Sequence, residues 1–313
     1  MLFGLPTIWL LVTVVFVMVH LAPGDPLTFI TGEGDISSEQ LARLRAEYGL
    51  DRPLATQYVL YLKKIAVGDF GFSYRYRAPV LELIADRIPA TLLLMGPSLA
   101  LFIGLGMLLG IVAARRPNSG IDLFMSGLAL VGWSVPVFWL GQLLIIAFAL
   151  KLGWFPTQGM FNLRAPAQGF GRALDVAWHL VLPATALGMR FLALSTRMTR
   201  SSMLQVLRLD YMTTARAKGL PERVVVARHG LPNALLPVIT IVGMNVGTML
   251  SGSVLVEVVF AWPGMGRLLY DGVLARDYPL IIGIILIVSV AVVLVNLITD
   301  VVYAIVDPRI RYD

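Results

Sequence analysis

The sequence has no cysteine and few charged residues, and each of these features excludes certain kinds of site or classes of protein. Without cysteine there are no disulfides, no thiolate metal ligands and no thiol nucleophile. Charged residues make up 14% of the 313 residues, whereas a soluble domain carries about 25%. With 58% hydrophobic residues and a mean hydropathy of +0.80, the composition predicts an all-α, polytopic membrane protein.

The short motifs of common catalytic and nucleotide-binding sites are also missing from the sequence. There is no GxxxxGK[ST] phosphate loop, so ATP chemistry is not expected on this chain, and neither HExxH nor GxSxG occurs. The three histidines, His20, His179 and His229, are scattered without metal-ligand spacing. We therefore predict that the chain is not an enzyme and binds no metal or cofactor of its own. The net charge of +6 is dispersed around apolar runs, which does not suggest nucleic-acid binding.

Six apolar runs are long enough to cross about 30 Å of hydrocarbon as helices. The first begins near Met1 without a basic segment before it, so a retained helix is favoured over a cleaved signal peptide. The runs predict a first transmembrane helix at 1–22, an extracytoplasmic loop domain at 23–89 and a five-helix core at 90–313 that includes a cytoplasmic loop at 200–235. The predicted spans are 2–22, 90–114, 121–150, 179–199, 235–260 and 279–306.

Basic residues in the short loops predict the orientation of the chain. With the N-terminus inside, the inner segments 115–120, 197–234 and 307–313 hold 11 basic residues, and the short outer segments 151–178 and 261–278 hold 5. Both termini are therefore expected in the cytoplasm.

The long first loop carries its own helix signals. Ser37 and Gln40 form a capping-box pattern ahead of LARLRAEYG, and a second helix is predicted through TQYVLYLKKIA, ending near Gly68. The loop could cap the outer mouth of a pathway, receive a partner or be a structural insertion.

Prolines and paired glycines inside the apolar runs predict a packed, kinked bundle. Arg190 is interpreted as a structural residue that extends its charge toward the cytoplasmic surface, and Glu257 could line an outer gate, pair with Arg267 or lie at the water interface. The candidate gate or pathway residues are Pro136, Asn245 and Glu257. The interrupting prolines are Pro97, Pro136, Pro183 and Pro237, and the glycine pairs are Gly106/Gly110 and Gly243/Gly247.

The stretch DYMTTARAKG, residues 210–219, predicts a short cytoplasmic helix. Asp210 is a suitable N-cap, Gly219 suits a left-handed position after the last turn, and Pro221 prevents continuation. A second short helix is predicted from Pro221 to a stop at Gly230. Two short helices would form a rigid protrusion whose small residues permit docking into a groove, whereas a helix lying on lipid would need a large apolar face.

The same stretch resembles the signature of ABC-importer permeases, which is Glu-Ala-Ala, three residues, Gly, nine residues, then Ile-x-Leu-Pro. Aligned on Gly219, the signature falls on Thr213, Thr214 and Ala215 and ends at His229–Pro232, with Glu, the first Ala and Ile replaced. DYMTTARAKGL, RHGLPNALLP, SGSVLVEVVFAWPGMGRLLYDGV, RDYPLI and DPRIRY resemble the dipeptide/oligopeptide/nickel-type permeases more closely. The resemblance covers nearly the whole chain and fits the subunit with the long first periplasmic loop.

This resemblance implies a type I ABC-importer permease fold with six transmembrane helices in the cell membrane of a prokaryote. It implies three kinds of partner protein in a complex embedded in membrane lipid. These are a second homologous permease, two cytoplasmic ATPase subunits that carry ATP and Mg, and an extracytoplasmic binding protein that delivers a di- or oligopeptide to the two permeases. The implied coupling helix comprises Asp210, Tyr211, Thr213, Thr214, Ala215, Arg216, Ala217, Lys218 and Gly219, followed by loop residues Arg228, His229, Leu231 and Pro232. Ala215→Asp or Gly219→Val is expected to uncouple ATP hydrolysis from uptake.

Other interpretations stay open at this point. Similar permeases move nickel chelates, glutathione or opines. An ion-coupled secondary transporter would require paired inner acids and inverted repeats, which are not evident, and an intramembrane hydrolase would require a catalytic histidine.

Overall fold

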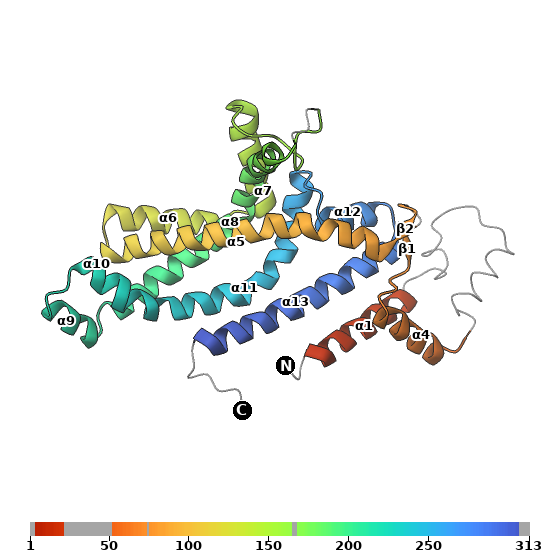
Figure 1. The fold of residues 1–313 in the computed structure, drawn as a ribbon, viewed down its shortest axis with the longest axis horizontal. Coiled ribbons are helices and arrows are strands. Elements are labelled where there is room, and N and C mark those ends of the chain that lie inside the picture. The colour runs from red at the N-terminus through yellow and green to blue at the C-terminus, as the bar shows by residue number, and fades with distance from the viewer. Residues whose placement is uncertain (1–3, 22–51, 74, 165–167, 307–313) are drawn as a thin grey trace. The chain divides into compact units, whose positions relative to one another are not determined.

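The computed structural model describes residues 4–21, 52–73, 75–164 and 168–306, which are mostly helical (Figure 1). The predicted helix at 37–49 lies outside these residues. The helices are α1 (Gly4–Leu21), α4 (Leu54–Ala66), α5 (Val80–Arg115), α6 (Gly120–Ser134), α7 (Val137–Leu144), α8 (Phe170–Val206), α9 (Asp210–Ala217), α10 (Glu222–Val224), α11 (Leu231–Val259), α12 (Met265–Leu274) and α13 (Tyr278–Val306). Two π-helical segments, η1 (Ile145–Lys151) and η2 (Val225–Gly230), and two short strands, β1 (Phe72–Ser73) and β2 (Ala78–Pro79), complete the described elements.

The chain divides into two compact units, one of residues 1–91 and 263–297 and the other of residues 92–262 and 298–313. In the first unit, β1 and β2 pair antiparallel, with Ser73 opposite Ala78. The Ser73 hydroxyl donates to the Asp277 carboxylate, which ties this hairpin to the turn between α12 and α13. The apolar core beneath it consists of Val80, Ile84, Met265, Leu268, Leu280 and Ile284.

Helix α4, also in the first unit, confirms the helix predicted for TQYVLYLKKIA. It ends at Ala66, and Gly68 adopts a φ of +80°. Its contacts with α1 are polar as well as aromatic: Thr13 Oγ1 lies 2.6 Å from the Tyr58 hydroxyl, and His20 Nε2 lies 3.0 Å from Gln57 Oε1. Burial raises the pKa of Tyr61 to about 12, because the charged phenolate would lose its contact with water.

In the second unit, α8 packs against α6, α7 and α11. Gly106 on α5 permits close approach to α8, because a Cβ at this position would lie 2.6 Å from the Leu192 carbonyl oxygen. At Gly110 a Cβ would lie 2.7 Å from the Thr196 carbonyl oxygen. These contacts confirm the predicted close packing at the first glycine pair.

A partly buried ion pair joins α6 to α8 in the same unit. Arg200 donates from Nε and Nη2 to the two carboxylate oxygens of Asp122, at 2.5 and 2.7 Å. Asp122 also accepts the main-chain amide of Asn118, which fixes the entry into α6. A bidentate arginine–carboxylate pair holds two helices in one register because both partners are planar.

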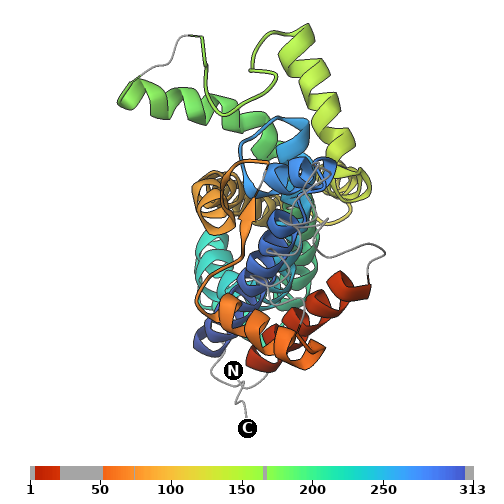
Figure 2. The ribbon, with the colours of Figure 1, turned by 90° about the vertical axis from the view of Figure 1, so that its right-hand side faces the viewer.

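Three described helices are long and apolar enough to cross a membrane, namely α5, α8 and the Tyr278–Thr299 part of α13. The number rises to five if each of two bent helix pairs counts as one span, and the apolar part of α1 is shorter, Pro6–Met18. The run predicted at 121–150 is interrupted at Pro136, as this proline predicted: α6 and the α7–η1 segment are bent by 110° there (Figures 1 and 2). Helices α5, α8 and α11 continue through Pro97, Pro183 and Pro237, so among the four prolines Pro136 alone separates two helices.

Candidate coupling site

Helix α9 occupies the predicted position, but its first turn differs from the prediction. Leu209 is the N-cap, with φ −76° and ψ 150°, and Asp210 is the first helical residue rather than the cap. The Asp210 carboxylate therefore acts on the positive end of the helix dipole instead of capping an amide. The end is as predicted, because Gly219 has a φ of +77° and its amide donates to the Arg216 carbonyl.

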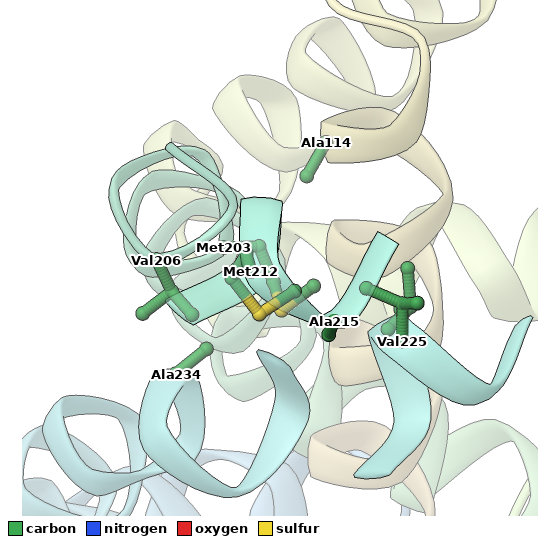
Figure 3. Packing of buried hydrophobic residues seen from close by; sticks show 8 residues of the cluster. Ala114, Met203, Val206, Met212, Ala215, Val225 and Ala234 are labelled. Atoms are coloured by element: carbon green, nitrogen blue, oxygen red, sulfur yellow. The ribbon is translucent and has the colours of Figure 1, made fainter. Parts of the chain in front are cut away.

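One side of α9 is buried against the chain itself (Figure 3). Met212 is fully buried and Ala215 is 6% exposed. Their neighbours come from α5, α8, η2 and α11: Ala114, Met203, Val206, Val225, Val226 and Ala234. The prediction that Ala215 is small in order to dock a partner is therefore wrong, because its methyl group fills this intramolecular cluster. Ala215→Asp would place a carboxylate among apolar side chains and so would test folding rather than docking.

The opposite side of α9 is exposed and carries hydroxyl, methyl and cationic groups. These residues are available to a partner because the chain itself does not cover them. The exposed residues are Asp210, Tyr211, Thr213, Thr214, Arg216, Ala217, Lys218 and Gly219.

An ion pair connects α9 to the next helical segment. Arg216 Nη2 lies 3.0 Å from Glu222 Oε1, and Arg216 Nε donates to Glu222 Oε2 at 3.2 Å. Hydrogen bonding to Glu222 raises the pKa of Arg216 above its ordinary value. Because both side chains are largely exposed, the pair orients the turn around Gly219 more than it stabilises the fold.

The helix predicted to stop at Gly230 continues instead. Gly230 is helical, with φ −84° and ψ −54°, and η2 runs directly into α11. Its lack of a side chain serves packing, because a Cβ would meet the Met212 side chain at 3.3 Å. The stop prediction failed because a glycine can mark either a left-handed cap or a close contact.

The residues that follow α9, the candidate coupling helix, are arranged around the start of α11. Asn233 Nδ2 donates to the Tyr211 hydroxyl at 3.0 Å and to the His229 carbonyl at 3.2 Å, joining α9 to α11. Leu231 packs on the buried cluster, whereas Arg228 and Pro232 are exposed. Asn233, Glu222 and Met212 were not selected from the sequence. The signal for Met212 was its apolar side chain three residues before Ala215, on one helix face.

The candidate pathway residues are not gathered in one place by the described contacts. Pro136 is exposed at the 110° bend, as the N-cap of α7. Asn245 is half-buried in α11, and its carbonyl accepts the Thr248 hydroxyl. Glu257 is fully buried, so the interpretation that it lies at the water interface is wrong for this chain. Within the described ranges, no cluster of three His, Cys, Asp or Glu side chains could hold a metal ion.

Comparisons with known proteins agree with this architecture. Residues 106–312 match the family described as "Binding-protein-dependent transport system inner membrane component", and residues 2–95 match "Binding-prot-dependent transport system membrane comp, N-term". The dipeptide transport system permease protein DppB of Escherichia coli (strain K12) is 41% identical over 325 residues, covering 98% of this chain and 96% of that protein. The oligopeptide transport system permease protein AppB of Bacillus subtilis (strain 168) is 45% identical over 298 residues, covering 95% and 93%.

Solved structures share the fold at lower sequence identity. An inward-facing structure of the MetNI methionine ABC transporter matches with a TM-score of 0.54 at 18% identity, covering 72% of this chain and 97% of that chain. An amino acid ABC transporter matches with a TM-score of 0.52 at 16% identity, covering 71% and 93%. At these identities the likeness concerns the fold alone, which confirms the predicted permease fold.

Proposed function

This chain belongs to the binding-protein-dependent transport system inner membrane components, and we propose that it is a peptide-importing permease subunit powered by ATP hydrolysis on other chains. Peptide cargo is supported by relatives that are named as dipeptide and oligopeptide permeases and are 41% and 45% identical over nearly the full length. The chain is an inner-membrane protein with several spanning helices. Its own sequence has no phosphate loop, so the hydrolysis is assigned to separate ATPase subunits.

The working complex in this proposal contains a second homologous permease, two cytoplasmic ATPases with ATP and Mg, and an extracytoplasmic binding protein. Helix α9 is the coupling helix, placed in the cytoplasm together with both termini. The observation that carries this assignment is that the two sides of α9 differ. Met212 and Ala215 are buried in the bundle, whereas Thr213, Thr214 and Ala217 are exposed.

Force transfer follows from the contacts of the anchored face. The buried cluster around α9 draws side chains from the ends of α5 and α8 and from the start of α11. Closure of the ATPases on ATP would move α9, and these three helices would move with it because the cluster is close-packed. Such a rigid-body switch between two arrangements requires that the ATP-bound motor bind one of them more tightly.

The experiment is uptake of a radiolabelled dipeptide into proteoliposomes that contain the complete complex, supplied with binding protein outside and ATP inside. Ala217→Trp places a large side chain on the exposed face of α9 and is expected to lower uptake at least about tenfold by blocking the docking contact. The matched control is Ala173→Trp, an exposed alanine in the first turn of α8, which should transport like the wild type. Wild-type uptake by Ala217→Trp would overturn the docking assignment, and uptake by this chain without ATPases would overturn the proposed function.

A further inference from the structure

Two arginines of α8 share one tryptophan of α6. The Arg190 guanidinium carbon lies 4.7 Å from the centroid of the Trp133 ring, and that of Arg197 lies 5.5 Å from the same centroid. The arginines are seven residues apart, which places them two turns apart on one helix face. Residues 191–196 between them are buried, whereas Arg190, Arg197 and Trp133 are all exposed. The pair therefore points away from the core of its own chain.

The position of Arg190 along α8 makes this exposure costly in lipid. Arg190 lies nine positions before the predicted inner end of the span at residue 199, a helix length of roughly 14 Å. A charge at such depth is tolerated where it faces a water-filled cavity or another protein surface, and such residues commonly mark transport pathways. The sequence-based interpretation of Arg190 as a residue that only extends to the cytoplasmic surface does not account for its stacking on Trp133.

A broken helix lies directly beside the two cations. Trp133 is the penultimate residue of α6, immediately before the 110° bend at Pro136. Gly132 touches α8 at Met189, since a Cβ on Gly132 would lie 2.9 Å from Met189 Cγ. Non-helical backbone at membrane depth is tolerated only where protein or a water-filled cavity satisfies its polar groups. The bend and the exposed cations thus point independently to a polar space at this position.

Within the part of the chain that the structure describes, the two arginines have no acidic partner. Among the described residues, neither forms an ion pair with a carboxylate, whereas Arg200 on the same helix is neutralised by Asp122. Stacking on an indole fixes the direction of a guanidinium but leaves its hydrogen-bond donors unused. Two cations held by one ring also repel each other, and an oxyanion bound between them would remove that repulsion.

We propose that Trp133, Arg190 and Arg197 form a carboxylate-binding site in the translocation pathway, at the break between α6 and α7. This inference rests on the proposed function, because the carboxylate is that of the cargo, which every peptide carries at its C-terminus. The planar forks of the arginines match a carboxylate in geometry as well as charge. The site recognises a group common to cargo of different side chains, so it is compatible with a pathway that discriminates little.

The test compares uptake of a labelled dipeptide with uptake of the same dipeptide carrying a C-terminal amide, by the complete complex in proteoliposomes. In Arg190→Gln/Arg197→Gln the ratio of carboxylate to amide uptake is expected to fall about tenfold from the wild-type ratio, the loss expected for a charge-assisted hydrogen bond. Any preference of the binding protein cancels, because the same binding protein serves both complexes. Arg190→Lys/Arg197→Lys should restore part of the ratio by restoring the charge.

Arg172→Gln is the matched control, because Arg172 is also on α8 and also stacks on an aromatic ring, Phe161, at 4.7 Å. Its carboxylate-to-amide ratio should equal that of the wild type. A wild-type ratio in the double glutamine variant would overturn the site. The inference would also be overturned if the ratio stayed constant while uptake followed the anionic phospholipid content of the vesicles, since the oxyanion would then be a lipid phosphate. Absence of ATP-dependent uptake by the wild-type complex would instead overturn the proposed function.

Discussion

At the scale of single residues, two glycines of α5 allow the effect of packing on stability to be distinguished from the effect of helix propensity. A Cβ on Gly106 would meet the Leu192 carbonyl oxygen at 2.6 Å and Ser195 Cβ at 2.8 Å, whereas a Cβ on Gly104 has nothing within 4 Å. Gly106→Ala should therefore destabilise the second unit by about 1–3 kcal/mol through overpacking. Gly104→Ala should be neutral or stabilising by up to about 1 kcal/mol, since alanine is the better helix former. Thermal unfolding of the purified protein in detergent measures both, and equal shifts would contradict the packing argument.

The same residues show how far sequence reasoning reaches at this scale. The spacing of Gly106 and Gly110 was enough to predict a close helix contact. Two glycines four residues apart leave one helix face without side chains, and in a spanning helix such a face mainly serves close packing against another helix. The partner, α8, could not be predicted, since the contact joins residues far apart in the chain. Ala215 was misassigned for the same reason: a small side chain is required equally by an external groove and by an internal cluster, and only the fold distinguishes them.

At the scale of elements, the end of α9 depends on the left-handed conformation of Gly219. Space is not limiting there, because no atom lies within 4 Å of a Cβ at this position. Gly219→Val should cost about 1–2 kcal/mol of backbone strain and loosen the turn to Glu222. The expected result is more ATP hydrolysed per peptide imported by the complete complex. Gly219→Asn is the control and should stay close to wild type, because asparagine tolerates this conformation; if both variants couple normally, the cap has no part in force transfer.

Elements were predictable from the sequence where local chemistry decides their ends. Helices α4 and α9 end next to the glycines that predicted their ends, Gly68 and Gly219, because such turn signals act within a few residues. The continuation of η2 through Gly230 and the pairing of Asp122 with Arg200 were missed. Both depend on contacts made across the bundle, which local patterns do not encode. Of the site, the position of α9 was predicted, and the burial of one of its faces through Met212 and Ala215 was not.

At the scale of the whole molecule, contacts within the second unit indicate which helix ends lie on the same side of the membrane. Ala114, at the end of α5, belongs to the same buried cluster as Met212 and Val225 around α9. The end of α5 and helix α9 therefore lie on the same side of the membrane. The chain between them must then cross the membrane an even number of times. This condition holds if α6 together with α7 makes one crossing and α8 makes another. A re-entrant loop at the 110° bend would make the number odd.

The absence of native cysteine makes this topology measurable with single introduced thiols. We choose three exposed positions: Gly120 at the start of α6, Leu163 between η1 and α8, and Gln205 in the last turn of α8. In intact spheroplasts a membrane-impermeant maleimide should label Leu163→Cys, whereas Gly120→Cys and Gln205→Cys should react only after permeabilisation, because the inner segments carry the excess of basic residues. Labelling of Gly120→Cys together with Leu163→Cys would show a re-entrant loop, and a fully reversed pattern would refute the cytoplasmic placement of α9 on which coupling to an ATPase depends.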